Sequence, residues 1–184
     1  MGTLKTTNIQ TITGSGTLTL GTSGETLAYG SGVTSNLLYP AFAMRGSGSL
    51  QTVTDNAFTK AQLNVADLDT NSACDTTTNY RFTVPSGKGG KYFIYASLNA
   101  YTGTNDQNLF DGLIYKNGSY IANNLWQYST AANAGRHNAY SQSILVDLSA
   151  GDYIELYGRI SGGSTEQFRR DDKSMLLGGY RIGT

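Results

Sequence analysis

The chain has 184 residues, of which 39% are hydrophobic and 14% are charged, with a formal net charge of zero. The balanced charge gives no sequence-independent attraction to nucleic acid, and no apolar run approaches the roughly 18 residues of a membrane helix, so neither a nucleic-acid partner nor membrane insertion is expected. A single cysteine excludes an internal disulfide, whereas 23 glycines and 13 tyrosines are typical of many short strands joined by glycine turns.

The first segment, residues 1–38, contains a short repeat. Residues 9–32 divide into three blocks of eight, IQTITGSG, TLTLGTSG and ETLAYGSG, and each block ends in Ser-Gly with an apolar residue at its fourth place. Strand-and-turn units of this kind need neighbouring copies to cover their apolar side. The segment is therefore predicted to be an attachment region that forms a short trimeric β stalk. A flexible linker rich in Ser, Gly and Thr is the alternative.

The remainder, residues 39–184, is predicted to be one β head. A strand at 41–45 is followed by a glycine-rich bulge or turn at 46–49 and by more strand at 50–53, and residues 58–68 are expected to form a strand pair. The acidic residues Asp67, Asp69 and Asp75 suggest a loose calcium site. Ser72 stands where an EF-hand loop needs glycine, so an Asx-rich turn is the alternative.

The stretch from Cys74 to Tyr101 is predicted to contain the central strand. From Lys91 onward, alternate residues sort onto two faces, and both faces carry aromatic rings. This period of two predicts a strand that is covered on both faces. Downstream, Asn117-Gly118 between apolar flanks predicts a two-residue hairpin turn.

The last third alternates predicted strands and loops. Residues 126–140 are polar and are interpreted as an exposed loop, and strands are expected at 142–148, 153–160 and 175–182. A second loop covers 161–173, where Arg169 and Asp171 belong to a run of mixed charges interpreted as a solvated surface, with a functional ligand pair as the alternative. Seven or more strands at this spacing indicate an all-β antiparallel sandwich or jelly roll.

The sequence offers little for catalysis. The only Cys/His pair is Cys74 with His137, and neither has a local pattern typical of a catalytic nucleophile. There is no phosphate-binding loop, no dinucleotide fingerprint and no zinc-ligand cluster. We therefore expect a protein that is not an enzyme and that uses no cofactor.

Residues 39–184 resemble the C1q-like domain, a jelly-roll trimerisation and recognition module also found in relatives of tumour necrosis factor. The resemblance rests on an ordered set of short matches: Cys74 to Thr78, Phe82-Thr83-Val84-Pro85, Gly90-Lys91-Tyr92-Phe93, Lys116-Asn117-Gly118, Leu148 with Gly151-Asp152, and Leu177 to Ile182. The chain departs from the family in an extra Lys-Gly-Gly after Pro85 and in having no collagen-like stalk. The resemblance implies a homotrimer, with Phe93, Tyr95 and Tyr180 as candidates for the interface near a threefold axis.

The first ten residues, MGTLKTTNIQ, are similar to the opening of small virion-associated proteins of tailed bacteriophages, particularly marine and cyanobacterial ones. This likeness implies a fibre or appendage on the virion surface that binds other virion proteins through residues 1–38 and a host-surface glycan or protein through the head. The alternatives are a capsid decoration protein that binds no host and a polysaccharide-degrading enzyme.

Aromatic and arginine side chains dominate binding hot spots. The candidate ligand contacts are therefore Tyr101, Asn105, Trp126, Tyr128, Arg136, His137 and Tyr140. Packing of these loops against neighbouring subunits is the alternative.

Overall fold

The computed structural model describes residues 40–128, 135–163, 165–171 and 173–183, and the predicted stalk with its eight-residue blocks lies outside them. Every regular element in these ranges is a β-strand, and all strand pairs are antiparallel. The prediction of an all-β antiparallel sandwich is confirmed. The described residues form no helix that is long and apolar enough to cross a membrane.

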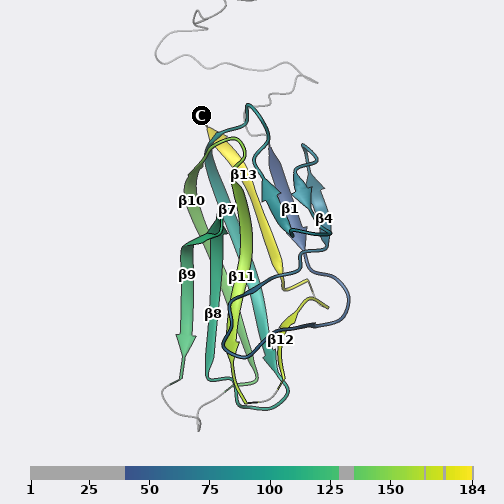
Figure 1. Ribbon diagram of the computed structural model, residues 1–184, viewed down its shortest axis with the longest axis vertical. Coiled ribbons are helices and arrows are strands. Elements are labelled where there is room, and N and C mark those ends of the chain that lie inside the picture. The colour runs from purple at the N-terminus through teal and green to yellow at the C-terminus, as the bar shows by residue number, and fades with distance from the viewer. Residues whose placement is uncertain (1–39, 129–134, 164, 172, 184) are drawn as a thin grey trace, which may run out of the picture. The chain divides into compact units, whose positions relative to one another are not determined.

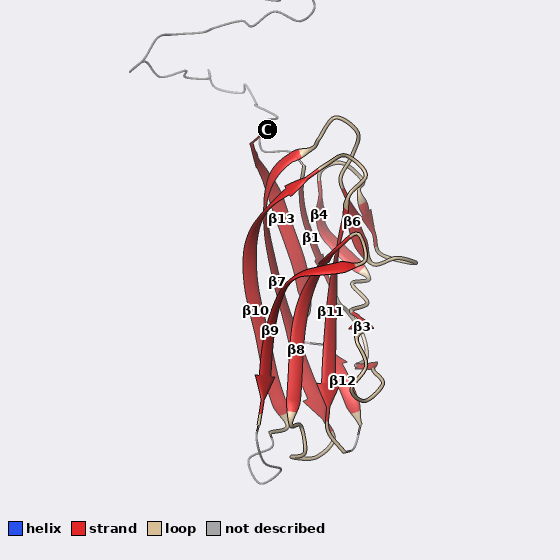
Figure 2. Cartoon of the chain, turned by 60° about the vertical axis from the view of Figure 1, so that its left-hand side comes forward, coloured by secondary structure: helices blue, strands red, loops and turns tan. Residues whose placement is uncertain are grey.

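The strands form two sheets that lie face to face (Figure 2). Sheet A contains seven strands: β1 (Ala41–Arg45), β2 (Gln51–Thr52), β4 (Val65–Asp69), β7 (Gly90–Thr102), β10 (His137–Leu148), β12 (Glu166–Arg169) and β13 (Leu176–Gly183). Sheet B contains six: β3 (Thr59–Lys60), β5 (Cys74–Asp75), β6 (Arg81–Thr83), β8 (Leu109–Lys116), β9 (Ser119–Gln127) and β11 (Tyr153–Ser161).

Strand β7 is the centre of sheet A, as predicted. It pairs with β10 along its length on one side and with β13 and then β12 on the other. Its inward residues Tyr92, Ile94 and Leu98 are fully buried in the core between the sheets. Aromatic rings help to fill this core, where Phe42 stacks on Phe82 with ring centroids 4.0 Å apart.

The outward face of β7 differs from the prediction. Phe93, Tyr95 and Tyr101 are only half-buried, because no described element covers the outer face of sheet A. A period of two with aromatic rings on both faces predicted cover on both sides, but within the described chain the cover comes from one side only. The consequence is an aromatic surface that is open in the single chain.

The predicted hairpin is present. Strands β8 and β9 are joined by Asn117 and Gly118, which have φ angles of 52° and 81°. These positive angles are those that a two-residue type I′ turn requires, and asparagine and glycine tolerate them best.

Two other expectations are wrong. Residues 58–68 do not form a strand pair, because β3 pairs with β11 in sheet B and β4 pairs with β1 in sheet A. Residues 126–140 are not one loop, because β9 continues to Gln127 and His137 begins β10. The start of β10 was predicted as loop because its sequence is polar, and the sequence is polar because one side of this strand faces outward along sheet A.

Candidate functional site

The outer face of sheet A carries the predicted interface residues. Residues that pair directly across antiparallel strands point to the same side of a sheet. Phe93 on β7 pairs with Leu145 on β10 and with Tyr180 on β13, and Tyr95 pairs with Gly178. These side chains therefore lie together on the outer face of sheet A.

The three predicted interface rings form one contiguous group. The ring centroid of Phe93 lies 5.6 Å from that of Tyr180 and 6.4 Å from that of Tyr95. A Cβ atom added at Gly178 would lie 2.3 Å from Tyr95 ring atoms, so glycine at this position lets the ring lie flat against β13. The structure brings Phe93, Tyr95 and Tyr180 together.

Large exposed apolar side chains continue this surface. Leu145 is 67% exposed, Tyr180 40% and Ile182 41%, and Leu68 extends the same face across β1 to β4. A hollow of about 200 Å³ lies beside Tyr95. We name the set Leu68, Phe93, Tyr95, Leu145, Tyr180 and Ile182 the apolar face. Contiguous exposed apolar surface of this kind is a mark of interaction sites.

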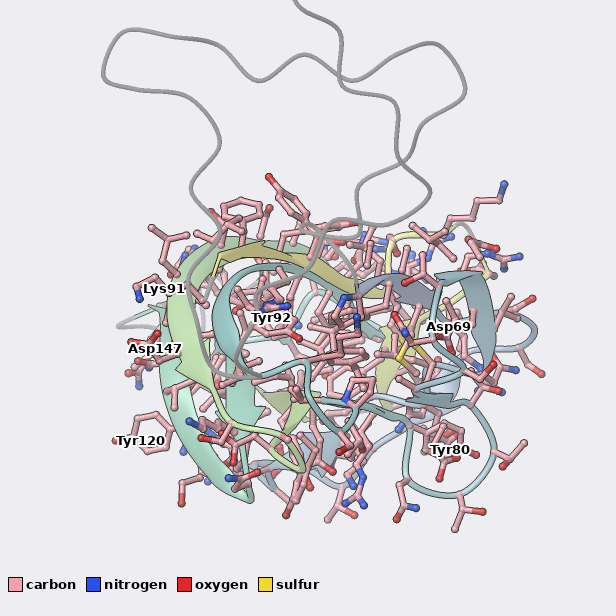
Figure 3. All side chains as sticks on the ribbon, turned by 90° about the horizontal axis from the view of Figure 1, so that it is seen from above. Asp69, Tyr80, Lys91, Tyr92, Tyr120 and Asp147 are labelled. Carbon is pink, nitrogen blue, oxygen red and sulfur yellow. The ribbon has the colours of Figure 1, made fainter. Side chains whose placement is uncertain are left out.

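One end of the apolar face is bounded by charge. Lys91 and Asp147 lie at the outer rim of the molecule, with 3.8 Å between Nζ and the carboxylate (Figure 3). The next residue, Tyr92, points into the interior in the same view. A solvated charged rim beside an apolar centre is the usual anatomy of a protein interface.

The opposite end of the same sheet face is polar and holds a cavity of about 330 Å³. Three of the predicted ligand contacts, Tyr101, Arg136 and His137, line it. The guanidinium group of Arg136 donates a 2.7 Å hydrogen bond to the Tyr101 hydroxyl, and the Tyr101 and His137 ring centroids are 4.9 Å apart. We call this cavity the end pocket.

The other residues that line the end pocket are Leu50, Arg169 and Asp171, and none of them was among the predicted ligand contacts. Arg169 donates two hydrogen bonds of 3.1 and 3.0 Å to Asp171, and these bonds lower the pKa of the Asp171 carboxyl below its usual range. The charge run was interpreted as a solvated surface. The pairing of β12 with β7, which no local pattern shows, is what brings Arg169 beside Tyr101.

The remaining predicted contacts fall outside the end pocket. Trp126 and Tyr128 contact each other edge-on with centroids 3.8 Å apart, and Asn105 is exposed in the loop after β7. The expectation of an exposed contact is wrong for Tyr140, which is 3% exposed and belongs to the core. Its ring occupies the space that a side chain at Gly112 would need, with ring atoms 2.2 Å from the ideal Cβ position.

The three aspartates of the calcium hypothesis have separate partners in the structure and are not gathered into one site. Asp67 accepts two hydrogen bonds from Arg45, Asp69 accepts the backbone N–H groups of Ala73 and Cys74, and Asp75 accepts those of Thr77 and Thr78. Within the described ranges, no group of three or more His, Cys, Asp or Glu side chains is arranged to hold a metal ion. The Asx-rich turn is the arrangement that the chain adopts.

The lone thiol is poorly suited to catalysis. Burial, followed by the negative charge of Asp69, raises the pKa of the Cys74 thiol well above its usual value. The thiol therefore stays protonated at neutral pH, whereas a nucleophilic cysteine needs the thiolate. Cys74 begins β5 in sheet B and His137 begins β10 in sheet A, so the two residues belong to different sheets.

Comparison with solved structures shows the fold. The chain is similar to Eiger TNF from S. frugiperda, with a TM-score of 0.59 and 13% identity over 80% of this chain and 94% of that one. It is also similar to murine APRIL at pH 5.0, with a TM-score of 0.56 and 10% identity over 77% of this chain and 98% of that one. No protein-family model and no curated protein sequence matches the chain. The fold is a TNF-like jelly roll, and the jelly-roll prediction is confirmed.

Proposed function

We propose that the protein is a homotrimeric structural and binding protein, in which the jelly-roll head assembles through the apolar face and presents its polar end to a ligand. The observation that carries this proposal is the apolar face itself, whose aromatic centre is open in the single chain. Monomeric proteins rarely leave such a contiguous patch in water. A second and a third copy of the chain are the occupants that complete it.

The two ends of sheet A suit different tasks. Pro40, where the described chain begins, accepts a hydrogen bond from the Arg181 backbone N–H, so the described head begins beside the end of β13 (Figure 1). Tyr101 lies ten residues along β7 from Lys91, a distance of roughly 33 Å at about 3.3 Å per residue. The end pocket therefore lies at the opposite end of sheet A from Pro40 and is open to a partner.

The proposed setting is a virion surface, and its support is the likeness of residues 1–10 to small virion-associated proteins of tailed bacteriophages. Residues 1–38 would bind other virion proteins, and the head would bind a host-surface glycan or protein. Three identical heads on one stalk raise avidity by roughly 10² to 10⁴ over a single site without any new contact. Weak individual sites then suffice for attachment.

Two other functions remain as alternatives. A capsid decoration protein would use the apolar face for assembly but would bind no host, and a polysaccharide-degrading enzyme would need a catalytic carboxylate pair. Two buried carboxylates are engaged in ion pairs, Glu155 with Lys60 and Asp111 with Arg159, which favours a structural role for them. We propose that the protein is not an enzyme.

The test uses the isolated full chain and cells of the host. Saturable binding to host cells, absent from unrelated bacteria, supports attachment, whereas a trimer that binds no cells supports decoration. Shortening of host polysaccharide on incubation with the protein would support the enzyme and contradict the proposal.

A further inference from the structure

The end pocket has the composition of a site for a small acidic ligand. Its walls combine a guanidinium group, an imidazole, a phenol ring, an aliphatic side chain and an Arg–Asp ion pair. Small-molecule pockets span roughly 300 to 1,000 Å³, and this cavity lies at the lower end of that range. Its size suits one monosaccharide unit rather than a longer stretch of chain.

The charges in the end pocket favour one negative group. Arg169 is balanced within the pocket by Asp171, which the two hydrogen bonds hold in its ionised form. Arg136 is exposed, and among the described side chains Tyr101 is the one that accepts a hydrogen bond from it. Among the described residues that line the end pocket, two arginines therefore stand against one carboxylate, and the excess positive charge belongs to Arg136.

Arg136 is already held in place for recognition. Its guanidinium carbon lies 5.1 Å from the Tyr101 ring centroid, and one N–H group is fixed on the Tyr101 hydroxyl. The planar guanidinium fork carries five donors and matches a carboxylate with two parallel hydrogen bonds. Fixing the fork in advance reduces the entropy lost when a ligand binds.

The other walls suit a sugar ring. Leu50 and the Tyr101 ring offer apolar surface to ring C–H groups, and Asp171 offers carboxylate oxygens to hydroxyl donors. His137, the first residue of β10, packs against Tyr101 and forms another part of the wall. A neutral sugar would leave the excess charge of Arg136 unmatched, and a simple carboxylate would leave the apolar wall unused.

We propose that the end pocket binds a carboxylated monosaccharide unit, such as a uronic acid, with the carboxylate on Arg136 and the sugar ring against Tyr101 and Leu50. This inference rests on the proposed attachment function and names the chemical class of its ligand. An acidic surface polysaccharide supplies such units in many copies, and a trimer engages three of them at once.

The full-length protein is titrated separately with methyl β-D-glucuronide, methyl β-D-glucoside and sodium acetate. Binding is measured by calorimetry and by NMR. We expect binding of the glucuronide only. Arg136→Gln should weaken it about 10- to 100-fold, because a charge-assisted hydrogen-bonded pair is lost. Tyr101→Phe keeps the ring but removes the acceptor that fixes Arg136, and should weaken binding about 3- to 10-fold.

The matched control is Arg81→Gln. Arg81 also lies on a tyrosine ring, 4.1 Å from the Tyr153 centroid, but belongs to β6 in sheet B. The Arg81→Gln substitution should leave glucuronide binding unchanged. Equal binding of the glucoside or of acetate, undiminished binding by Arg136→Gln and Tyr101→Phe, or no binding of the glucuronide would each overturn the inference.

Sedimentation of the same samples separates this inference from the proposed function. A trimer that binds host cells but not the glucuronide leaves the proposed function in place and removes the inference. A monomer that binds the glucuronide contradicts the assembly and leaves the pocket chemistry intact.

Discussion

Leu145→Ser is the substitution that separates assembly from folding. Leu145 is 67% exposed on the edge strand β10, so about two thirds of its side chain remains available for burial between subunits. Full burial of a leucine is worth roughly 1.5–3 kcal/mol, so the available part is worth about 1–2 kcal/mol per subunit. Three subunits lose about 3–6 kcal/mol together, which lowers the association constant of the trimer by roughly 10² to 10⁴.

The assay compares sedimentation equilibrium with urea unfolding of the dissociated subunit. Leu145→Ser should shift the protein toward monomers at micromolar concentration, while the free energy of unfolding of the monomer changes by less than about 0.5 kcal/mol, as for other exposed positions. Phe58→Ser is the control, because Phe58 is also half exposed, at 50%, but precedes β3 of sheet B. An unchanged trimer in Leu145→Ser, or equal dissociation in Phe58→Ser, would refute the assignment of the apolar face.

Three further predictions concern close packing and acid stability. Gly178→Ala places a Cβ atom 2.3 Å from Tyr95 ring atoms, so the Tyr95 ring must move away from β13. Sedimentation should show a weakened trimer, and an unaffected trimer would count against the role of Tyr95. Gly112→Ala forces a Cβ atom to 2.2 Å from the buried Tyr140 ring and should lower the free energy of unfolding in urea by about 1–3 kcal/mol or more. An unchanged free energy of unfolding would show that the ring can move aside. Hydrogen bonds from Asn117 and Lys116 lower the pKa of Asp152 to about 2, so this carboxylate stabilises the fold above its ordinary pKa of 3.8 and the contribution is lost as pH falls toward 2. Asp152→Asn should therefore unfold more easily at pH 7 and lose less stability between pH 4 and pH 2 than the wild type, and parallel pH profiles would contradict this assignment.

Local patterns in the sequence were sufficient for the elements that local physics determines. Alternation along 91–101 predicted the central strand, because one side of β7 fills the core of the chain itself. Asn117-Gly118 predicted the hairpin, because few residues accept two successive positive φ angles. The alternation also grouped Phe93 and Tyr95 on one face of the strand, but it did not show which of the two faces fills the core. Periodicity also does not distinguish cover by the same chain from cover by another chain.

The errors have a common physical origin in contacts between distant segments. Tyr140 is buried because Gly112, on a strand of the opposite sheet, leaves room for its ring. Arg169 reaches the end pocket because β12 pairs with β7. The acidic turn from Asp67 to Asp75 offered carboxylates at a suggestive spacing, but backbone N–H groups and Arg45 occupy them. In each case the residue that determines the contact is separated from the predicted residue by several positions in the sequence or lies in the opposite sheet.

The mass of the wild-type chain in solution tests the proposed assembly most directly. Sedimentation of the full-length protein at micromolar concentration should give three times the mass of one chain, because the apolar face is then covered by neighbouring copies. A stable monomer at that concentration, with the apolar face open to water, would contradict the account.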